Sequence, residues 1–106
     1  MAKYQLLVVS NPVAGKEDEY NNWYDKQHLG DVIAMDGYTA AKRYTVTHLM
    51  GDQPAGTYAA IYEMETDDPM AAFASLGKAM EAGTMYISPA MDPVKVSIQL
   101  LTPIEG

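Results

Sequence analysis

The 106-residue sequence contains no cysteine. This absence excludes disulfide bonds, catalytic thiols and metal sites built from thiolates. Histidine is almost as scarce, since His28 and His48 are the only two and neither has a histidine at the i, i+4 spacing of a zinc motif. We therefore predict neither a metal site nor a cofactor. A metal held by His28, Asp31 and a further carboxylate is the weaker alternative.

Basic residues are few, and long apolar runs are missing. Seven Lys and Arg stand against 14 Asp and Glu, and the net charge is −7. The basic residues are scattered singly except at Lys42-Arg43, whereas binding to phosphate backbones needs them concentrated, so we predict no nucleic acid partner. No apolar run approaches the ~18 residues of a membrane span. The N-terminus also lacks the apolar stretch of a signal peptide, so we predict no membrane partner and a cytoplasmic location.

The patterns that are present predict four strands and two helices. The strands are expected over residues 3–10, 38–49, 57–65 and 94–101, with a turn over 51–56. The first helix is expected over residues 17–28, and it could resume after Gly30 and extend as far as Met35. The second should begin with Asp68 as N-cap and Pro69 in the first helical position, and end at Gly83. A loop over residues 84–91 follows it.

This β-α-β-β-α-β order predicts a single α+β domain over residues 1–106 with a ferredoxin-like fold. Right-handed crossovers would place both helices on one face of a four-stranded antiparallel sheet. The segment 3–10 is apolar on both alternating faces, so apolar surface should remain on the open face. Either row of the last strand could turn toward the helices. An exposed apolar sheet face is typical of an interface, and we predict a homodimer through it.

The first helix carries an aromatic stripe that becomes polar toward its C-terminus. At 100° per residue, the residues on this stripe are Tyr20, Trp23, Tyr24, Gln27 and His28, joined by Asp31 and Met35 if the helix continues. Burying amide, imidazole and carboxylate groups is costly unless each one finds a partner. Polar groups at the end of a buried aromatic stripe are typical of a small-molecule pocket.

The residues of this stripe offer a coherent set of chemical roles. His28 can move protons near neutral pH, and Asp31 could orient it. Tyr24 or Tyr20 could donate a hydrogen bond to a carbonyl or enolate oxygen, and Trp23 could stack on a flat ring. The structural alternative has equal weight. His28 could instead cap the helix or sit satisfied in the core, with Asp31 as the N-cap of a second short helix.

Two further candidates lie outside the helix. The Arg43 guanidinium could bind a substrate carboxylate, although a cross-strand partner such as Glu63 is the simpler role. Tyr86, in the 84–91 loop, could close over a pocket as a lid or only anchor the loop by packing.

The run from Glu19 to Val32, EYNNWYDKQHLGDV, followed by Gly37-Tyr38 and Arg43-Tyr44, resembles the dimeric α+β barrel superfamily, and within it EthD-like proteins. The recurring pattern is an aromatic residue, a histidine a few residues later, and a Gly-aromatic step into the second strand. The resemblance implies the fold and the homodimer. It also implies activities on small, often aromatic compounds, with His28 at the functional position and Trp23, Tyr24 and Asp31 around it.

Three functions follow from these observations. The first is a cofactor-independent lyase, cyclase, decarboxylase or monooxygenase that acts on a small aromatic or polyketide-like carbonyl compound, with His28 as general acid or base. The second is a non-catalytic small-ligand-binding or accessory protein. The third is a heme-binding protein, because the superfamily includes heme-degrading members.

Overall fold

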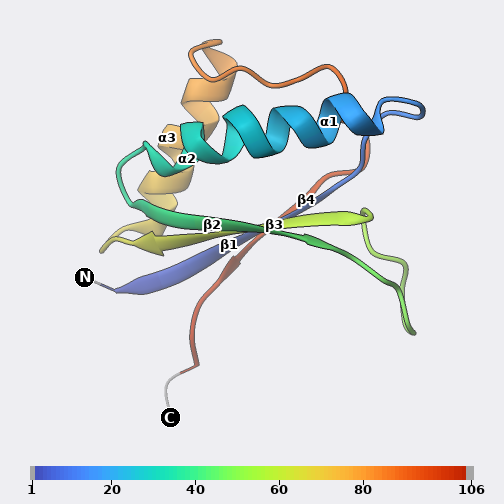
Figure 1. Cartoon of the computed structure of the whole chain (residues 1–106). Helices are drawn as coiled ribbons and strands as arrows, with labels where there is room; N and C mark the ends of the chain where they lie inside the picture. The colour runs from blue at the N-terminus through green and yellow to red at the C-terminus, as the bar shows by residue number, and fades with distance from the viewer. Residues whose placement is uncertain (1, 105–106) are drawn as a thin grey trace.

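The computed structural model describes residues 2–104 as one antiparallel sheet with all helices on one side of it (Figure 1). The strands are β1 (Lys3–Ser10), β2 (Tyr38–Thr45), β3 (Tyr58–Glu65) and β4 (Ser97–Leu101), in the order β2-β3-β1-β4. The helical segments are α1 (Glu17–Trp23), η1 (Tyr24–His28), α2 (Leu29–Ile33) and α3 (Pro69–Glu81). The ferredoxin-like α+β prediction is therefore confirmed.

Strand β1 lies in the interior of the sheet, between β3 and β4. Its register pairs Leu6 with Tyr62 of β3 and with Leu100 of β4. Leu6 and Val8 are buried beneath the helices, whereas Leu7 and Val9 point to the opposite face and are half-buried. The strand thus has apolar side chains on both faces, as its sequence predicted, and no helix covers the second one (Figure 1).

The first helical region runs without a break from Glu17 to Ile33. The predicted interruption between residues 28 and 30 is wrong, and Gly30 lies inside α2. The irregularity is instead a π-helical turn, η1, in which the Leu29 N–H bonds to the Tyr24 carbonyl five residues back. Such single-turn insertions in α-helices are rare and occur frequently at functional sites.

The π-turn shifts the buried stripe by one residue. A regular helix would place Gln27 and Asp31 below Trp23 and Tyr24. Here Gln27 is exposed and Asp31 is half-exposed. His28 and Val32 take the inward positions in their place, and Val32 is fully buried. The predicted stripe is therefore correct as far as Tyr24 and His28, and wrong for Gln27 and Asp31.

Helix α3 begins and ends as predicted. The Asp68 carboxylate accepts a hydrogen bond from the Ala71 N–H at 3.0 Å, and Pro69 occupies the first turn. Such an N-cap contributes about 1 kcal/mol. Gly83 follows the C-cap residue Ala82 and has a φ of 76°, a left-handed conformation that favours glycine. The predicted inward residues Phe73, Leu76 and Met80 all pack on the core.

Two strands are shorter than predicted. Strand β2 ends at Thr45, and the last hairpin bond joins the Val46 N–H to the Thr57 carbonyl, so residues 47–49 are not paired. Strand β4 begins at Ser97, because the Asp92 carboxylate accepts from the Val94 N–H and makes a turn there. The apolar row of β4 faces the helices, since Ile98 pairs with Val8 and Leu100 with Leu6.

The segment between α3 and β4 crosses the helical layer toward the start of α1 (Figure 1). Residue Pro12 forms a bridge with Met91, and the Val13 N–H bonds to the Ala90 carbonyl at 2.6 Å. The segment therefore closes one end of the space between helices and sheet.

Within residues 2–104, no helix combines the length and the apolar character needed to cross a membrane.

Candidate functional site

A cavity of about 210 Å³ lies between the helices, the sheet and the segment after α3. Its wall is formed by apolar side chains from every layer of the fold, among them Leu6, Val8, Val32, Phe73, Leu76, Met80, Ile87, Met91, Val96 and Ile98. Three side chains with polar atoms interrupt this wall, namely His28, Tyr24 and Tyr62. A mostly apolar hollow with few polar groups is the usual form of a small-molecule site.

His28 is buried at the wall of this cavity, with 5% of its surface exposed. Two rings hold it. Trp23 stacks on the imidazole with centroids 4.5 Å apart at 25°, and Tyr24 meets it edge-on at 5.1 Å. Within residues 2–104, the His28 Nδ1 atom has no hydrogen-bond partner. Buried polar atoms are nearly always paired, so an unpaired nitrogen is unusual in a folded core.

Burial lowers the pKa of His28 to about 4, and the nearby negative charge of Asp31 offsets part of this effect. The imidazole is therefore neutral at pH 7. Across the described part of the chain, no hydrogen bond joins Asp31 to His28. Asp31 therefore acts on the imidazole only through its charge. The Trp23 and Tyr24 rings, which contact the imidazole, take the orienting role that was predicted for Asp31.

Tyr62 of β3 supplies the second unpaired polar atom. Its side chain is 1% exposed, and among residues 2–104 its hydroxyl has no partner with full hydrogen-bond geometry, although the Tyr24 hydroxyl is close enough to act on it as a hydrogen-bond neighbour. Burial raises the pKa of Tyr62, and the neighbouring Tyr24 adds to the increase, so the phenol keeps its proton. Sequence reasoning missed this residue. The only signal in the sequence was the large side chain of Tyr62, which follows two alanines in the run Ala59-Ala60-Ile61-Tyr62.

Tyr24 lines the cavity, whereas Tyr20 lies one turn earlier and does not. Burial raises the pKa of Tyr24 to about 12, and Tyr20 adds to the effect. The Tyr20 hydroxyl is engaged with the Ser10 hydroxyl at 2.6 Å. Tyr20 therefore supports Tyr24 by an edge-on ring contact at 5.3 Å, and does not reach a ligand in the cavity.

Arg43 of β2 lies outside the cavity, and its predicted pairing with Glu63 is wrong. The two side chains point to opposite faces of the sheet, because Arg43 pairs with Ala60 in the register. The guanidinium donates to Asp25 and to Asn21, each at 2.8 Å, and lies 4.6 Å from the Tyr24 ring. With its donors engaged, Arg43 stabilises the outer side of the aromatic cluster.

Trp23 and Tyr86 connect the helix to the segment after α3. The Trp23 indole N–H donates to the Tyr86 backbone carbonyl at 3.2 Å, while the Tyr86 ring is 52% exposed. The Tyr86 side chain therefore does not enter the cavity, and its neighbour Ile87 does. Of the eight side chains predicted for the site, the structure brings His28 and Tyr24 to the cavity wall. Trp23 lies directly behind them.

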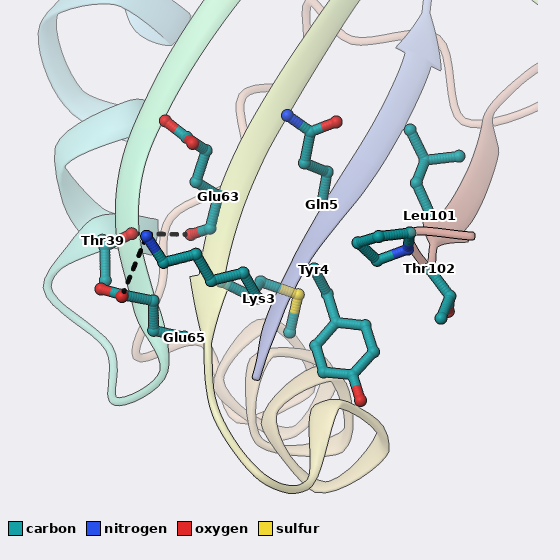
Figure 2. A pocket seen from close by; sticks show the side chains of 10 residues that line it. Lys3, Tyr4, Gln5, Thr39, Glu63, Glu65, Leu101 and Thr102 are labelled. Carbon is teal, nitrogen blue, oxygen red and sulfur yellow. Dashed lines mark hydrogen bonds and ion pairs between the residues drawn. The ribbon is translucent and has the colours of Figure 1, made fainter. Parts of the chain in front are cut away.

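A second hollow of about 460 Å³ lies on the open face of the sheet, near the start of β1 (Figure 2). Figure 2 shows Lys3 reaching toward Glu65, at 3.8 Å, and the Thr39 hydroxyl donating to the Glu63 backbone carbonyl. These groups are exposed to water, and such pairs contribute little. Nothing buried and unpaired points into this groove, so it is a weaker candidate.

Metal ligands are not assembled around either hollow. Within residues 2–104, no three His, Asp or Glu side chains are grouped in a way that could hold a metal ion. Asp31 is the acidic neighbour whose charge acts on His28, and no third ligand joins them.

Comparisons with solved structures found several similar folds. The heme-degrader MhuD of Mycobacterium tuberculosis, solved with two hemes in its active site, matches with a TM-score of 0.63 and 13% identity over 97% of each chain. Rv0793 of the same organism matches with a TM-score of 0.55 and 12% identity over 99% of this chain and 98% of its own. An EthD-like protein of Ralstonia eutropha matches with a TM-score of 0.51 and 14% identity over 92% of this chain and 91% of its own.

These likenesses confirm the predicted ferredoxin-like α+β fold, and an EthD-like protein is among the solved structures that share it. At such low identities they establish the fold alone. No family model matches the sequence, and no curated protein matches it either. The function must therefore be argued from the cavity itself.

Proposed function

We propose that this protein is a cofactor-independent enzyme that acts on a small aromatic or polyketide-like carbonyl compound bound beside His28. The observation that supports the proposal is the buried, neutral imidazole of His28, whose ring forms part of the wall of an apolar cavity. An unprotonated imidazole in a water-poor site can accept a proton from an O–H or from an acidic C–H next to a carbonyl.

Two tyrosine side chains would support this proton transfer. When a proton leaves the bound compound for His28, negative charge develops on the carbonyl or hydroxyl oxygen. The protonated hydroxyl of Tyr62, whose side chain borders the cavity, is one candidate donor of a hydrogen bond to that oxygen. Tyr24, on the same wall, is the second candidate for this role. Lyase, cyclase, decarboxylase and monooxygenase chemistry could each begin with this step.

The test combines a binding screen with a search for turnover. Neutral one-ring and two-ring compounds would be screened by thermal shift, with mass spectrometry of every compound that stabilises the protein. We expect one of them to be converted, and His28→Gln to lower the rate by about 10²–10⁴-fold, as for loss of a general base. The matched control is His48→Gln, which changes the exposed histidine and should leave the rate unaffected.

Two results would contradict the enzyme proposal. If His28→Gln mainly unfolds the protein, the imidazole has a structural role. If compounds raise the melting temperature of the protein but are themselves recovered unchanged in mass and structure, the alternative holds. That alternative is a non-catalytic small-ligand-binding or accessory protein, and the same cavity would serve it.

We do not extend heme binding to this chain. The cavity of about 210 Å³ is smaller than the 300–1,000 Å³ typical of sites for drug-sized ligands, and a tetrapyrrole is larger than most of these. Heme propionates are also anionic, and no Lys or Arg belongs to the described lining of the cavity. The residues present therefore do not fit this group.

We further propose that two copies of the chain associate through the open face of the sheet. Leu7, Val9 and Ile61 lie half-buried at its centre, and Tyr44 and Leu101 are 43% and 38% exposed. A contiguous apolar surface of this kind favours association. A twofold axis would let the same face meet itself, with the polar groove of Figure 2 toward the edge.

A further inference from the structure

We propose that Gly77 of α3 sets the size of the compound that binds beside His28. Its missing side chain leaves a recess in the cavity wall, and the apolar body of an uncharged compound lies in this recess against the helix backbone. This inference rests on the proposed function, because it takes the cavity as the place where the compound binds. It adds the residue that limits the ligand and the chemical class of the part that this residue contacts.

Glycine is an unfavourable residue at this place in the chain. Gly77 lies in the interior of α3, where a glycine loses more conformational freedom on folding than any other residue. Alanine is the best helix former, and it occurs at four other positions of the same helix. The glycine therefore weakens a helix that is otherwise built from favourable residues.

None of the usual local reasons for a glycine applies to Gly77. Its backbone is right-handed and helical, unlike that of Gly83, which follows the helix with a positive φ. A Cβ atom at Gly56 would collide with the backbone of Ser10. A Cβ atom at Gly77 would meet no described atom within 4 Å, apart from its chain neighbours and the backbone of its own helix. An alanine would therefore fit at position 77 without strain.

The empty space beside Gly77 belongs to the cavity. Gly77 forms part of the cavity wall together with Phe73 and Met80 of the same helix. Residues four positions before and three positions after a helical residue are its neighbours on the helix surface. Two large side chains therefore flank a position that has none. His28 borders the same hollow, so a compound that lies in the recess shares its space with the imidazole.

The recess suits an apolar, uncharged group. The described wall of the cavity contains no Asp, Glu, Lys or Arg. A charged group would lose its hydration there without gaining a counter-ion, which is strongly unfavourable. The bare backbone at Gly77 also lets a ring or a chain approach the helix more closely than a side chain would permit. The part of the compound that contacts Gly77 is therefore hydrocarbon.

The experiment follows binding along a series of phenyl ketones, from acetophenone to hexanophenone, that grows by one methylene at each step. Calorimetry on the whole chain at pH 7 measures each affinity. In the wild type we expect the affinity to rise about fourfold with each buried methylene until the cavity is full, and then to fall. Gly77→Ala should move this maximum to a shorter ketone, and Gly77→Leu should remove binding of the longer ketones altogether.

The melting temperature of the unliganded protein is the second measurement. Because the space at position 77 is empty, Gly77→Ala should raise the melting temperature by a few degrees while it restricts binding. The matched control is Gly30→Ala. Gly30 is also helical, with no described atom near a Cβ at that position, but it is exposed and does not border the cavity. The control should raise the melting temperature similarly and leave the binding maximum unchanged.

The results separate this inference from the proposed function. An unchanged binding maximum in Gly77→Ala, or a lowered melting temperature, overturns the role of Gly77. If no ketone binds the wild type, this inference is also overturned, whereas conversion of another compound that depends on His28 would still support the enzyme. A shifted maximum without conversion of any compound supports the role of Gly77 and favours the non-catalytic alternative.

Discussion

Two buried atoms without partners distinguish this core from an ordinary one. The His28 nitrogen and the Tyr62 hydroxyl each lie under the protein surface with no hydrogen bond inside residues 2–104. Leaving such a group unpaired costs about 1–3 kcal/mol. Both atoms belong to side chains that border one cavity, so the cost falls at the place where we propose that a ligand binds.

The first prediction concerns the Tyr62 hydroxyl. Because the atom is buried and unpaired, Tyr62→Phe should raise the free energy of unfolding by up to about 1–2 kcal/mol. Tyr20→Phe provides the matched contrast. The Tyr20 hydroxyl bonds to Ser10 at 2.6 Å, so its removal should lower the free energy by about 1 kcal/mol. Urea denaturation measures both, and destabilisation by Tyr62→Phe would show that its hydroxyl is satisfied.

The second prediction concerns pH. The pKa of His28 is about 4 in the folded protein against 6.5 for the free side chain, so the unfolded chain binds the extra proton between these values. His28 therefore makes the folded state lose stability as pH falls from about 6.5 to about 4, with a slope near 1.4 kcal/mol per pH unit. Asp31, whose charge favours the imidazolium, limits this loss.

The measurement is the difference in unfolding free energy between wild type and His28→Gln across this pH range. Carboxylates titrate in both proteins and largely cancel in the difference. We expect the variant to lose less stability toward pH 4. Parallel curves for the two proteins would mean that His28 is accessible to solvent and charged at the same pH as a free histidine.

Part of the arrangement around His28 and Tyr62 could be predicted from the sequence. The aromatic stripe of the first helix placed His28 inward correctly, because a helix that buries Tyr20, Trp23 and Tyr24 also carries the residues of the next turn to the core. Tyr62 could not be placed in the same way. Its strand has small or apolar residues on both faces, so alternation alone does not show which face meets the helices.

At the scale of elements, the π-turn η1 decides which polar side chain enters the core. It adds one residue between Tyr24 and Leu29, so that Gln27 turns outward and only His28 of the two faces the core. No local signal in the sequence marks this insertion. Gly30 and Asp31 suggested a helix break, but the burial of Val32 holds the helix together across them.

The third prediction tests the π-turn by deletion. Removing the exposed Lys26 would let residues 17–33 form one regular α-helix, with His28 and Val32 still on the inward side. We expect this variant to fold with a melting temperature close to wild type, since the same side chains remain buried. Its binding of the aromatic compounds found in the thermal-shift screen should fall, because the imidazole no longer sits at the wider π-turn.

A deletion in a regular helix is the control for this experiment. Removing the exposed Ser75 from α3 would rotate the inward residues Leu76 and Met80 away from the core, and should destabilise the protein strongly. Circular dichroism during thermal unfolding compares the two variants. If deletion of Lys26 is as damaging as deletion of Ser75, the π-turn is needed for folding.

At the scale of the whole molecule, the open sheet face is the main unpartnered surface of the fold (Figure 1). The order of elements, which followed from strand and helix patterns along the chain, was sufficient to predict the layers and this open face. The lengths of β2 and β4 were not predictable, because strand-like residues continue past the last paired ones.

The fourth prediction concerns the proposed dimer. Ile61→Lys places a charge at the centre of the open face, where it would be buried without a partner, so it should shift the protein toward monomers. Ala74→Lys, on the exposed side of α3, should have no effect. Sedimentation velocity at several concentrations measures the shift. A wild-type protein that stays monomeric at every concentration would contradict the interface.

The hydrogen bond between Trp23 and the Tyr86 carbonyl has a practical consequence. Trp23 is the single tryptophan of the chain, and it touches both the imidazole at the cavity wall and the segment that closes the cavity. Its intrinsic fluorescence therefore originates at one known place. A compound that enters the cavity, or a movement of residues 84–91, should alter that emission directly, which gives the protein a built-in optical reporter.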